Sequence, residues 1–347
     1  MERFPKSHLM GVVLAVVIGA APARAQLGLF DRAPASLAPL VRAIAPEVVG
    51  IAVTETPGAV TTQMPAPGQG RTLQTQPIVE AAGSGFIVRT DGMIVTNDHV
   101  VKGAARIVVT LNDGERFPGR VVAADDLTDI AIVKINVPRK LPVAAWGDSA
   151  KVQVGDWVLA AGNPFALGNS FTLGIISAQG RDIGDGPFDH FLQLDAPINP
   201  GNSGGPAFNM QGEVIGINSA IVSPSGGSVG IGFAIPSDSA RPIVDALIAH
   251  GDIARGWLGL SVADAPGGAE GAAITGVEPG GPADRAGLVS GEVVVSVNGH
   301  GVTGAAGLIR AIALIAPKTK VVLGIQDDGH ISYLPVMIDR RPVQLGE

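Results

Sequence analysis

The sequence contains no cysteine, which excludes disulfides, thiol nucleophiles and cysteine-ligated zinc. Charged residues make up only 16% of the chain and hydrophobic residues 46%, which excludes a disordered, highly charged polymer. The net charge of −7 is acidic, and no run of Lys and Arg interleaved with aromatic residues occurs. A phosphate-backbone partner is therefore excluded as the main ligand, and we expect no nucleic-acid binding.

Glycine and proline are abundant instead, with 48 Gly and 26 Pro among 347 residues and no collagen-like period. This composition favours many short strands joined by turns over long helices. The length exceeds that of one ordinary hydrophobic core. We therefore predict a mainly β protein with a large first domain and a smaller second one.

The N-terminus has the pattern of an export signal. Arg3 and Lys6 precede the apolar run at 9–21, and Ala23-x-Ala25 follows as a small-residue cleavage pattern. We expect residues 1–25 to be a signal peptide and the protein to be periplasmic. The apolar run is shorter than the roughly 20 residues of a membrane span. An uncleaved membrane anchor stays open as the alternative.

The rest of the chain divides by its local patterns. Apolar residues at helical spacing after a possible N-cap at Ser36 predict a short helix, followed by a strand near Val48. We further expect an N-terminal segment 26–45 and a large, strand-rich domain over 46–250 with a long mobile loop at 56–82. This domain should end in a helix at 236–251 with Ser237 or Ser239 near its cap, and a second domain over 255–345 should contain a helix at 304–317.

The stretch INPGNSGGP at 198–206 places Ser203 among glycines, which suits a loop with exposed backbone amides. A serine hydroxyl becomes a nucleophile only with a base, an acid that orients the base, and amides that receive the oxyanion. His99 follows the strand-like run MIVTN, and Asp129 directly precedes the apolar run IAIVKI. These three residues are the predicted catalytic set.

The same residues allow other interpretations. GNSGG also fits the nucleophile elbow of α/β-hydrolases, but that motif needs a helix after the serine and the order serine, acid, histidine. Ser203 could lie in an ordinary turn, His99 could be a packed histidine and Asp129 a structural cap. The neighbouring Asp98 and Asp195 are expected to be structural.

Residues 36–250 resemble the trypsin-like protease domain of the Deg/HtrA family, and residues 255–345 resemble its single PDZ domain. The matching runs are GSGFIV, DGMIVTNDHVV, TDIAIVKI, TLGIISAQGR, LQLDAPINPGNSGGPAFN, GIGFAIP and, in the second domain, RGWLGLSV and GPADRAGLVSGEVVVSVNG. The resemblance implies two Greek-key β-barrels, with His99 and Asp129 on the first and Ser203 on the second. It also implies an oxyanion hole formed by the N–H groups of Gly201 and Ser203.

The resemblance further implies the ligand-binding residues. Ile198, Ile231 and Phe233 would line the pocket for the substrate residue before the cut bond, which favours small or medium apolar side chains. In the PDZ domain the carboxylate of a C-terminal peptide would be received by the loop residues Trp257, Leu258, Gly259 and Leu260. A homo-oligomer, a trimer or a multiple of it, would form through the segment near Phe30, and neither a metal nor an organic cofactor is needed.

The predicted function is an ATP-independent serine endopeptidase that cleaves unfolded or misfolded envelope proteins and is regulated by peptides bound to its PDZ domain. Two alternatives remain open. One is a chaperone or scaffold that binds unfolded chains or C-termini without cleaving them. The other is a membrane-anchored regulatory protease with one dedicated substrate.

Overall fold

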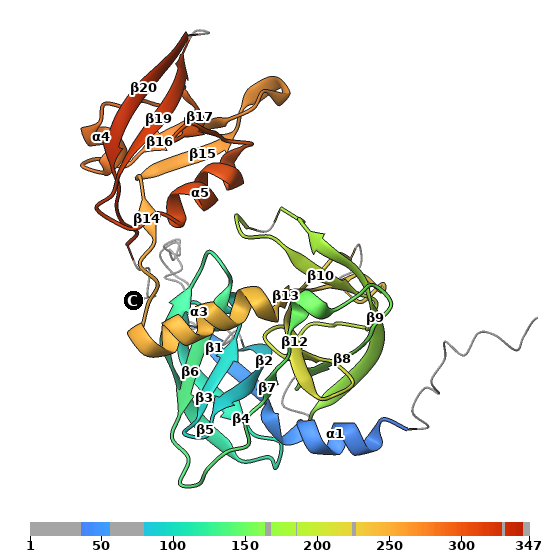
Figure 1. Cartoon of the computed structure of the whole chain (residues 1–347). Helices are drawn as coiled ribbons and strands as arrows, with labels where there is room; N and C mark the ends of the chain where they lie inside the picture. Colours follow the sequence, from blue (N-terminus) through green and yellow to red (C-terminus); the bar gives the residue numbers. More distant parts are fainter. Residues whose placement is uncertain are drawn as a thin grey trace, which may run out of the picture. The chain divides into compact units, whose positions relative to one another are not determined.

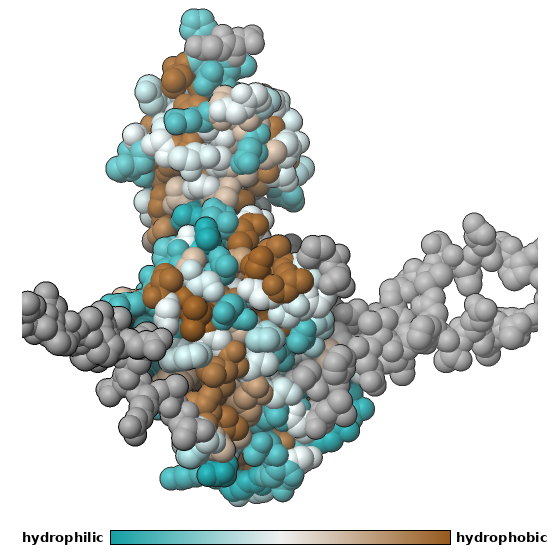
Figure 2. Space-filling view, turned by 90° about the vertical axis from the view of Figure 1, so that its right-hand side faces the viewer, coloured by the Kyte–Doolittle hydropathy of each residue, from teal (hydrophilic) through white to brown (hydrophobic). Residues whose placement is uncertain are grey.

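The computed structural model describes residues 36–55, 80–163, 168–184, 186–223, 227–327 and 330–342 (Figure 1). The predicted signal peptide at 1–25, Phe30 and residues 56–79 of the predicted loop lie outside the described residues. Within the described part, no helix is long and apolar enough to cross a bilayer. On the face shown in Figure 2, apolar residues form several separate patches between polar ones.

A short helix leads into the first barrel, as the sequence predicts. The barrel is closed, with strand order β1-β2-β3-β6-β5-β4. Its elements are α1 (Ala38–Ile44), the 3-10 turn η1 (Ala45–Glu47), β1 (Val48–Glu55), β2 (Glu80–Arg89), β3 (Met93–Thr96), α2 (Asp98–Val101), β4 (Ala104–Thr110), β5 (Arg116–Asp125) and β6 (Ile130–Ile135). β-Branched side chains such as Val49, Ile94 and Val133 fill its interior.

The predicted loop at 56–82 extends three residues too far. Strand β2 already begins at Glu80, and Ala81 and Ala82 pair with Val53 and Ala52 of β1. Alanine carries little intrinsic strand preference, so the local sequence did not indicate this strand end. The pairing with β1 determines it.

The second barrel is a seven-stranded sheet with the order β11-β8-β9-β10-β13-β12-β7, and the additional pairing of β11 with β12 closes it. Its interior holds a separate apolar cluster that includes Val158, Ile176 and Leu194. Its elements are β7 (Ala145–Trp146), η2 (Ser149–Lys151), β8 (Trp157–Gly162), β9 (Ser170–Arg181), β10 (Phe191–Leu194), β11 (Pro206–Phe208), β12 (Glu213–Ile221) and β13 (Gly232–Pro236).

Helix α3 (Ser237–His250) packs on β5 and β6 of the first barrel and on β12 and β13 of the second (Figure 1). Gly251 lies directly beyond its end, as predicted, and has the left-handed conformation. The predicted cap by Ser237 or Ser239 is wrong, because the residue before the helix is Pro236, which has no capping side chain, and the Asp238 N–H in the first turn donates to the Ser149 hydroxyl at 2.9 Å. The Ser237 hydroxyl instead donates to the carbonyl of Gly147 in the second barrel, at 2.9 Å.

The C-terminal domain has its own core, in which Leu308 and Ile312 of the helix α5 face sheet residues such as Ile274 and Leu323. The main sheet has the order β15-β16-β17-β19-β20. The helix predicted at 304–317 is present, but it is shorter than predicted, since α5 ends at Ala313. The elements are β14 (Gly256–Trp257), β15 (Leu260–Asp264), η4 (Pro266–Gly268), β16 (Ala272–Val277), α4 (Pro282–Arg285), β17 (Val293–Val297), β18 (His300–Gly301), α5 (Ala305–Ala313), β19 (Lys320–Asp327), β20 (His330–Met337) and β21 (Asp339–Arg340).

Candidate active site

The loop that carries Ser203 lies between β10 and β11 and is held by the backbone of both barrels. The Ser203 carbonyl accepts a hydrogen bond from the Ser84 N–H of β2, and Gly204 N–H donates to the carbonyl of Asn218 in β12, both at 2.8 Å. Gly201 and Gly204 have φ of 98° and 84°, a region that favours glycine. Among the described residues no group accepts from the N–H of Gly201 or Ser203. Both amides can therefore donate to an oxyanion.

His99 and Asp129 lie together at one end of the first barrel. His99 is in the single turn of α2, and Asp129 is in the turn before β6. His99 Nδ1 lies 2.8 Å from Asp129 Oδ2, and the His99 backbone N–H donates to Asp129 Oδ1 at 2.9 Å. Asp129 has φ of 55°, which is uncommon for a residue other than glycine. Such strain is typical of functional positions that the surrounding structure fixes.

Ser219 of β12 connects this pair to the nucleophile loop. Its hydroxyl donates to Asp129 Oδ2 at 3.1 Å, and its carbonyl accepts from the Ser203 hydroxyl at 3.2 Å. One residue of the second barrel therefore contacts both the acid of the first barrel and the nucleophile. Ser219 was not among the residues predicted from the sequence. Its available signal is a serine within the apolar strand GEVIGINSAIV, because a buried hydroxyl needs a hydrogen-bond partner.

The neighbouring acids have different surroundings from Asp129. Burial raises the pKa of Asp98, and the nearby charge of Lys102 opposes this shift. Asp195 accepts the Ile175 N–H at 2.6 Å, which agrees with the structural role that the sequence predicts. Asp129 is thus the acid that contacts His99.

The residues predicted to form the substrate pocket come together on the second barrel. A Cβ built on Gly232 would lie 2.8 Å from Ile198 Cδ1, so Ile198 packs on the 231–233 segment. Phe233 makes an edge contact with Phe191, with ring centroids 6.1 Å apart. Ile198 and Phe233 are buried, whereas Ile231 is partly exposed. The part of each in substrate selection stays a prediction.

A groove of about 110 Å³ lies in the C-terminal domain at the predicted peptide-binding position. The loop between β14 and β15 forms one wall and α5 the other. Strand β15 is at the edge of the main sheet. The lining residues are Gly256, Trp257, Leu258, Gly259, Leu260, Val262, Leu308, Ile309, Ile312, Ala313 and Arg341. An apolar groove beside an edge strand suits peptide binding by β-addition.

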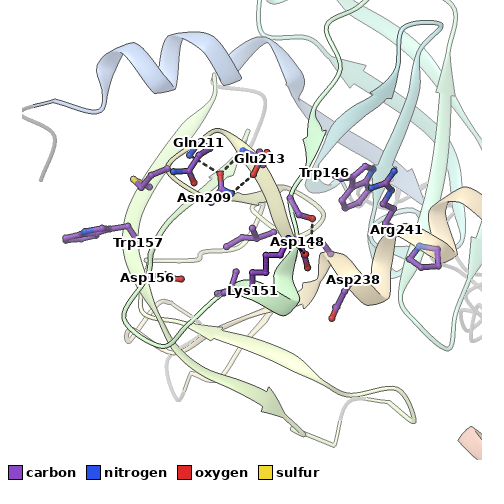
Figure 3. Close-up of a pocket in the computed structure, with 16 residues that line it drawn as sticks. Trp146, Asp148, Lys151, Asp156, Trp157, Asn209, Gln211, Glu213, Asp238 and Arg241 are labelled. Carbon is purple, nitrogen blue, oxygen red and sulfur yellow. Dashed lines mark hydrogen bonds and ion pairs between the residues drawn. The ribbon is translucent and has the colours of Figure 1, made fainter. Parts of the chain in front are cut away.

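A second depression, of about 750 Å³, is on the second barrel beside β7 and α3 (Figure 3). Polar groups along it bond to one another. Lys151 pairs with Asp148 at 3.0 Å, and the Asn209 amide donates to Glu213 at 2.8 Å. None of the predicted catalytic residues lines this depression. Across the described residues, no group of three or more His, Asp or Glu side chains is arranged to hold a metal ion.

Two closed β-barrels, with an acid–base pair on one and a serine in a glycine-rich loop on the other, define a trypsin-like peptidase. The C-terminal domain that follows is a PDZ domain. Models of these families match the chain: a trypsin-like peptidase domain over residues 83–217 and a PDZ domain over residues 273–327. Both matches lie inside the domains that the sequence predicts.

Curated relatives of similar sequence are serine endoproteases by name. The chain is 47% identical over 293 residues to a probable periplasmic serine endoprotease, DegP-like, of Brucella suis, covering 82% of this chain and 56% of the relative. A Rhizobium meliloti protein of the same name is 48% identical over 271 residues, covering 76% of this chain and 54% of the relative. The chain thus spans about half the length of the curated relatives it matches.

Solved structures match over a larger share. An HtrA-type protease, AlgW with a decapeptide, is 37% identical and has a TM-score of 0.71, covering 89% of this chain and 99% of the other. The serine endoprotease from Yersinia pestis is 33% identical with a TM-score of 0.67, covering 90% and 100%. The chain belongs to the HtrA family of serine proteases.

Proposed function

We propose that the protein is a periplasmic, ATP-independent serine endopeptidase with His99, Asp129 and Ser203 as its catalytic residues. The observation that carries the proposal is the chain of contacts from His99 through Asp129 and Ser219 to the Ser203 hydroxyl. The names of the relatives support the periplasmic location and the endoprotease activity.

In the proposed mechanism the Ser203 hydroxyl attacks the carbonyl carbon of the scissile bond, and His99 accepts its proton. Asp129 keeps the proton of His99 on Nδ1 and stabilises the imidazolium that forms. The N–H groups of Gly201 and Ser203 donate to the oxyanion of the tetrahedral intermediate. His99 then protonates the leaving amine, and a water molecule releases the acyl group by the same steps.

We further propose that the substrates are unfolded polypeptides cleaved after small or medium apolar residues. Such residues are buried in folded proteins and become accessible only on unfolding. The apolar character of Ile198, Ile231 and Phe233 supports this choice. Peptides with a free, apolar C-terminus would bind the groove between β15 and α5 and regulate cleavage.

The direct test compares the parent with Ser203→Ala in a casein cleavage assay without added nucleotide. We expect cleavage to fall by about 10⁶-fold while binding of unfolded casein persists. Ser239→Ala, an exposed serine on α3, is the matched control and should cleave like the parent. Equal cleavage by Ser203→Ala would refute the peptidase proposal, and binding without cleavage by the parent would favour the chaperone or scaffold.

The regulatory part has its own test. Peptides with apolar C-termini should change the cleavage rate of the parent, and the same peptides with an amidated C-terminus should not, because the loop amides at Trp257–Leu260 would receive a carboxylate. No effect of either peptide would contradict regulation through the groove.

Two further measurements test the other proposals. Mass spectrometry of the mature N-terminus distinguishes a cleaved signal, with Gln26 first, from an anchor. Analytical ultracentrifugation tests the proposed homo-oligomer.

A further inference from the structure

The motif GSGFIV at the end of β2 includes Ser84, which the mechanism above leaves without a role. Ser84 is fully buried, at 0% exposure. The glycines on either side have no room for a side chain, since a Cβ on Gly83 would lie 2.8 Å from Val100 Cγ2 and one on Gly85 would lie 2.7 Å from the Val95 carbonyl. The backbone of Ser84 is thus packed tightly against its surroundings, directly under the nucleophile loop.

The hydroxyl of Ser84 has both of its hydrogen-bonding directions fixed. It accepts the N–H of Asn163 at 2.8 Å and donates its one proton to the carbonyl oxygen of Gly201 at 2.5 Å. Because a hydroxyl has a single proton, the bond from Asn163 directs this proton to Gly201. A Cβ on Gly162 would lie 2.9 Å from the Ser84 oxygen, so the hydroxyl is enclosed from that side as well.

Successive peptide units of the nucleophile loop are held in different ways. The unit that ends in the Ser203 N–H is fixed by backbone, since the Asn202 carbonyl accepts from Gly205 N–H at 3.0 Å. The unit that joins Gly201 to Asn202 lies between the two proposed oxyanion donors. Its N–H donates to the Asn199 carbonyl at 3.0 Å, and its carbonyl is the group held by the Ser84 side chain.

Glycine allows this central peptide unit to rotate at little steric cost, because Gly201 has no Cβ and already has φ of 98°. The Gly201 N–H belongs to the preceding unit, which joins Pro200 to Gly201 and is connected to the central unit only through the Gly201 Cα. Rotation about the two Gly201 backbone torsions would turn these units relative to each other and leave one oxyanion donor misaligned. A donor contributes to catalysis only when it is already aimed at the oxygen before the reaction. The loop therefore needs a group that restrains Gly201 from its carbonyl side.

We propose that Ser84 is a positioning residue of the oxyanion hole, which sets the Gly201 N–H by holding the Gly201 carbonyl. The inference rests on the proposed peptidase function. Ser84 itself touches no reacting atom, so its loss should weaken binding of the transition state while leaving binding of the ground-state substrate largely unchanged. A residue that only stabilised the fold would not produce this difference.

The test uses Ser84→Ala in the full chain, with kcat and KM for a peptide substrate and the Ki of a peptide boronate. The tetrahedral adduct of the boronate with Ser203 places an oxygen where the oxyanion develops. We expect kcat to fall about 10- to 100-fold, KM to change less than about threefold, and the Ki of the boronate to rise by about the same factor as kcat falls. Circular dichroism at the assay temperature confirms that each variant is folded.

Ser237→Ala is a closely matched control. The Ser237 hydroxyl is also buried, at 1% exposure, donates to the Gly147 carbonyl at 2.9 Å and accepts the Ser149 N–H at 3.1 Å. It should leave kcat and the boronate Ki within about twofold of the parent. Ser84→Cys keeps a small side chain with a weak donor and should give an intermediate kcat.

The outcomes separate the inference from the proposed function. If the parent neither cleaves the peptide substrate nor forms an adduct with the boronate, the proposed peptidase function is contradicted. If the parent is active, the inference is overturned by a folded Ser84→Ala with kcat within about twofold of the parent, or by a fall in kcat without a change in the boronate Ki. It is also overturned if neither Ser84 variant folds while Ser237→Ala does, since Ser84 is then a residue of the fold alone.

Discussion

Replacing Asp129 by asparagine tests the acid–base pair most directly, because the structure dictates how the new amide must sit. Oδ1 of Asp129 accepts the His99 backbone N–H at 2.9 Å, so this position requires an acceptor. The oxygen of the introduced amide would take it, which leaves the NH₂ group at the place of Oδ2. That place lies 2.8 Å from His99 Nδ1. The amide would therefore donate to Nδ1.

An imidazole that accepts at Nδ1 carries its proton on Nε2 and cannot accept the proton of Ser203. The opposite orientation of the amide would set NH₂ against the backbone N–H of His99, two donors facing each other. We therefore expect the wrong tautomer in the folded enzyme and a fall in kcat of about 10⁴-fold, equivalent to about 5 kcal/mol of transition-state stabilisation. The KM should change little, because no substrate contact is removed.

The assay is steady-state cleavage of a peptide substrate, together with the rate of labelling of Ser203 by a fluorophosphonate. Asp98→Asn is the matched control, since Asp98 is also buried and next to His99 in the chain but has its pKa raised by burial. It should keep kcat within about threefold. A kcat for Asp129→Asn within about tenfold of the parent would refute the assignment of Asp129 as the orienting acid.

Two further predictions concern stability. Burial raises the pKa of Glu47 from 4.5 to about 7, so the folded state binds the proton more tightly and stability should fall as pH rises from about 4.5 to about 7. Because Glu47 is partly exposed, we expect Glu47→Gln to raise the free energy of unfolding by only about 1–2 kcal/mol at pH 8, and by little at pH 4, in thermal unfolding. The control Glu270→Gln, at an exposed position, should leave stability unchanged at both pH values. Equal stabilisation by Glu47→Gln at both pH values would contradict the prediction. Gly204→Ala should abolish cleavage and lower the melting temperature, because a Cβ there overlaps the Ser84 carbonyl oxygen. Gly103→Ala is the control, since Gly103 has φ of 70° and no atom within 4 Å of the added Cβ; it should cost about 1–2 kcal/mol of stability and keep activity. A similar effect of both substitutions would show that the left-handed backbone alone matters.

The sequence by itself determined the larger features of this protein. Local runs of β-branched residues between turns predicted the strands, and the apolar spacing before Gly251 predicted α3. The order of His99, Asp129 and Ser203 along the chain excluded the α/β-hydrolase arrangement. These features depend on side-chain periodicity and on motifs of a few neighbouring residues, which a linear chain displays directly.

The tertiary structure decided what depends on partners far away in the chain. Glu80 begins a strand because β1 pairs with it, and the Ser237 hydroxyl binds the second barrel, where the sequence suggested a helix cap. Ser219 and Ser84 are ordinary serines in strands until folding brings one to Asp129 and the other to Gly201, 90 and 117 positions away. A hydroxyl can bond to any polar group within about 3 Å, so only the packing of the two barrels selects its partner.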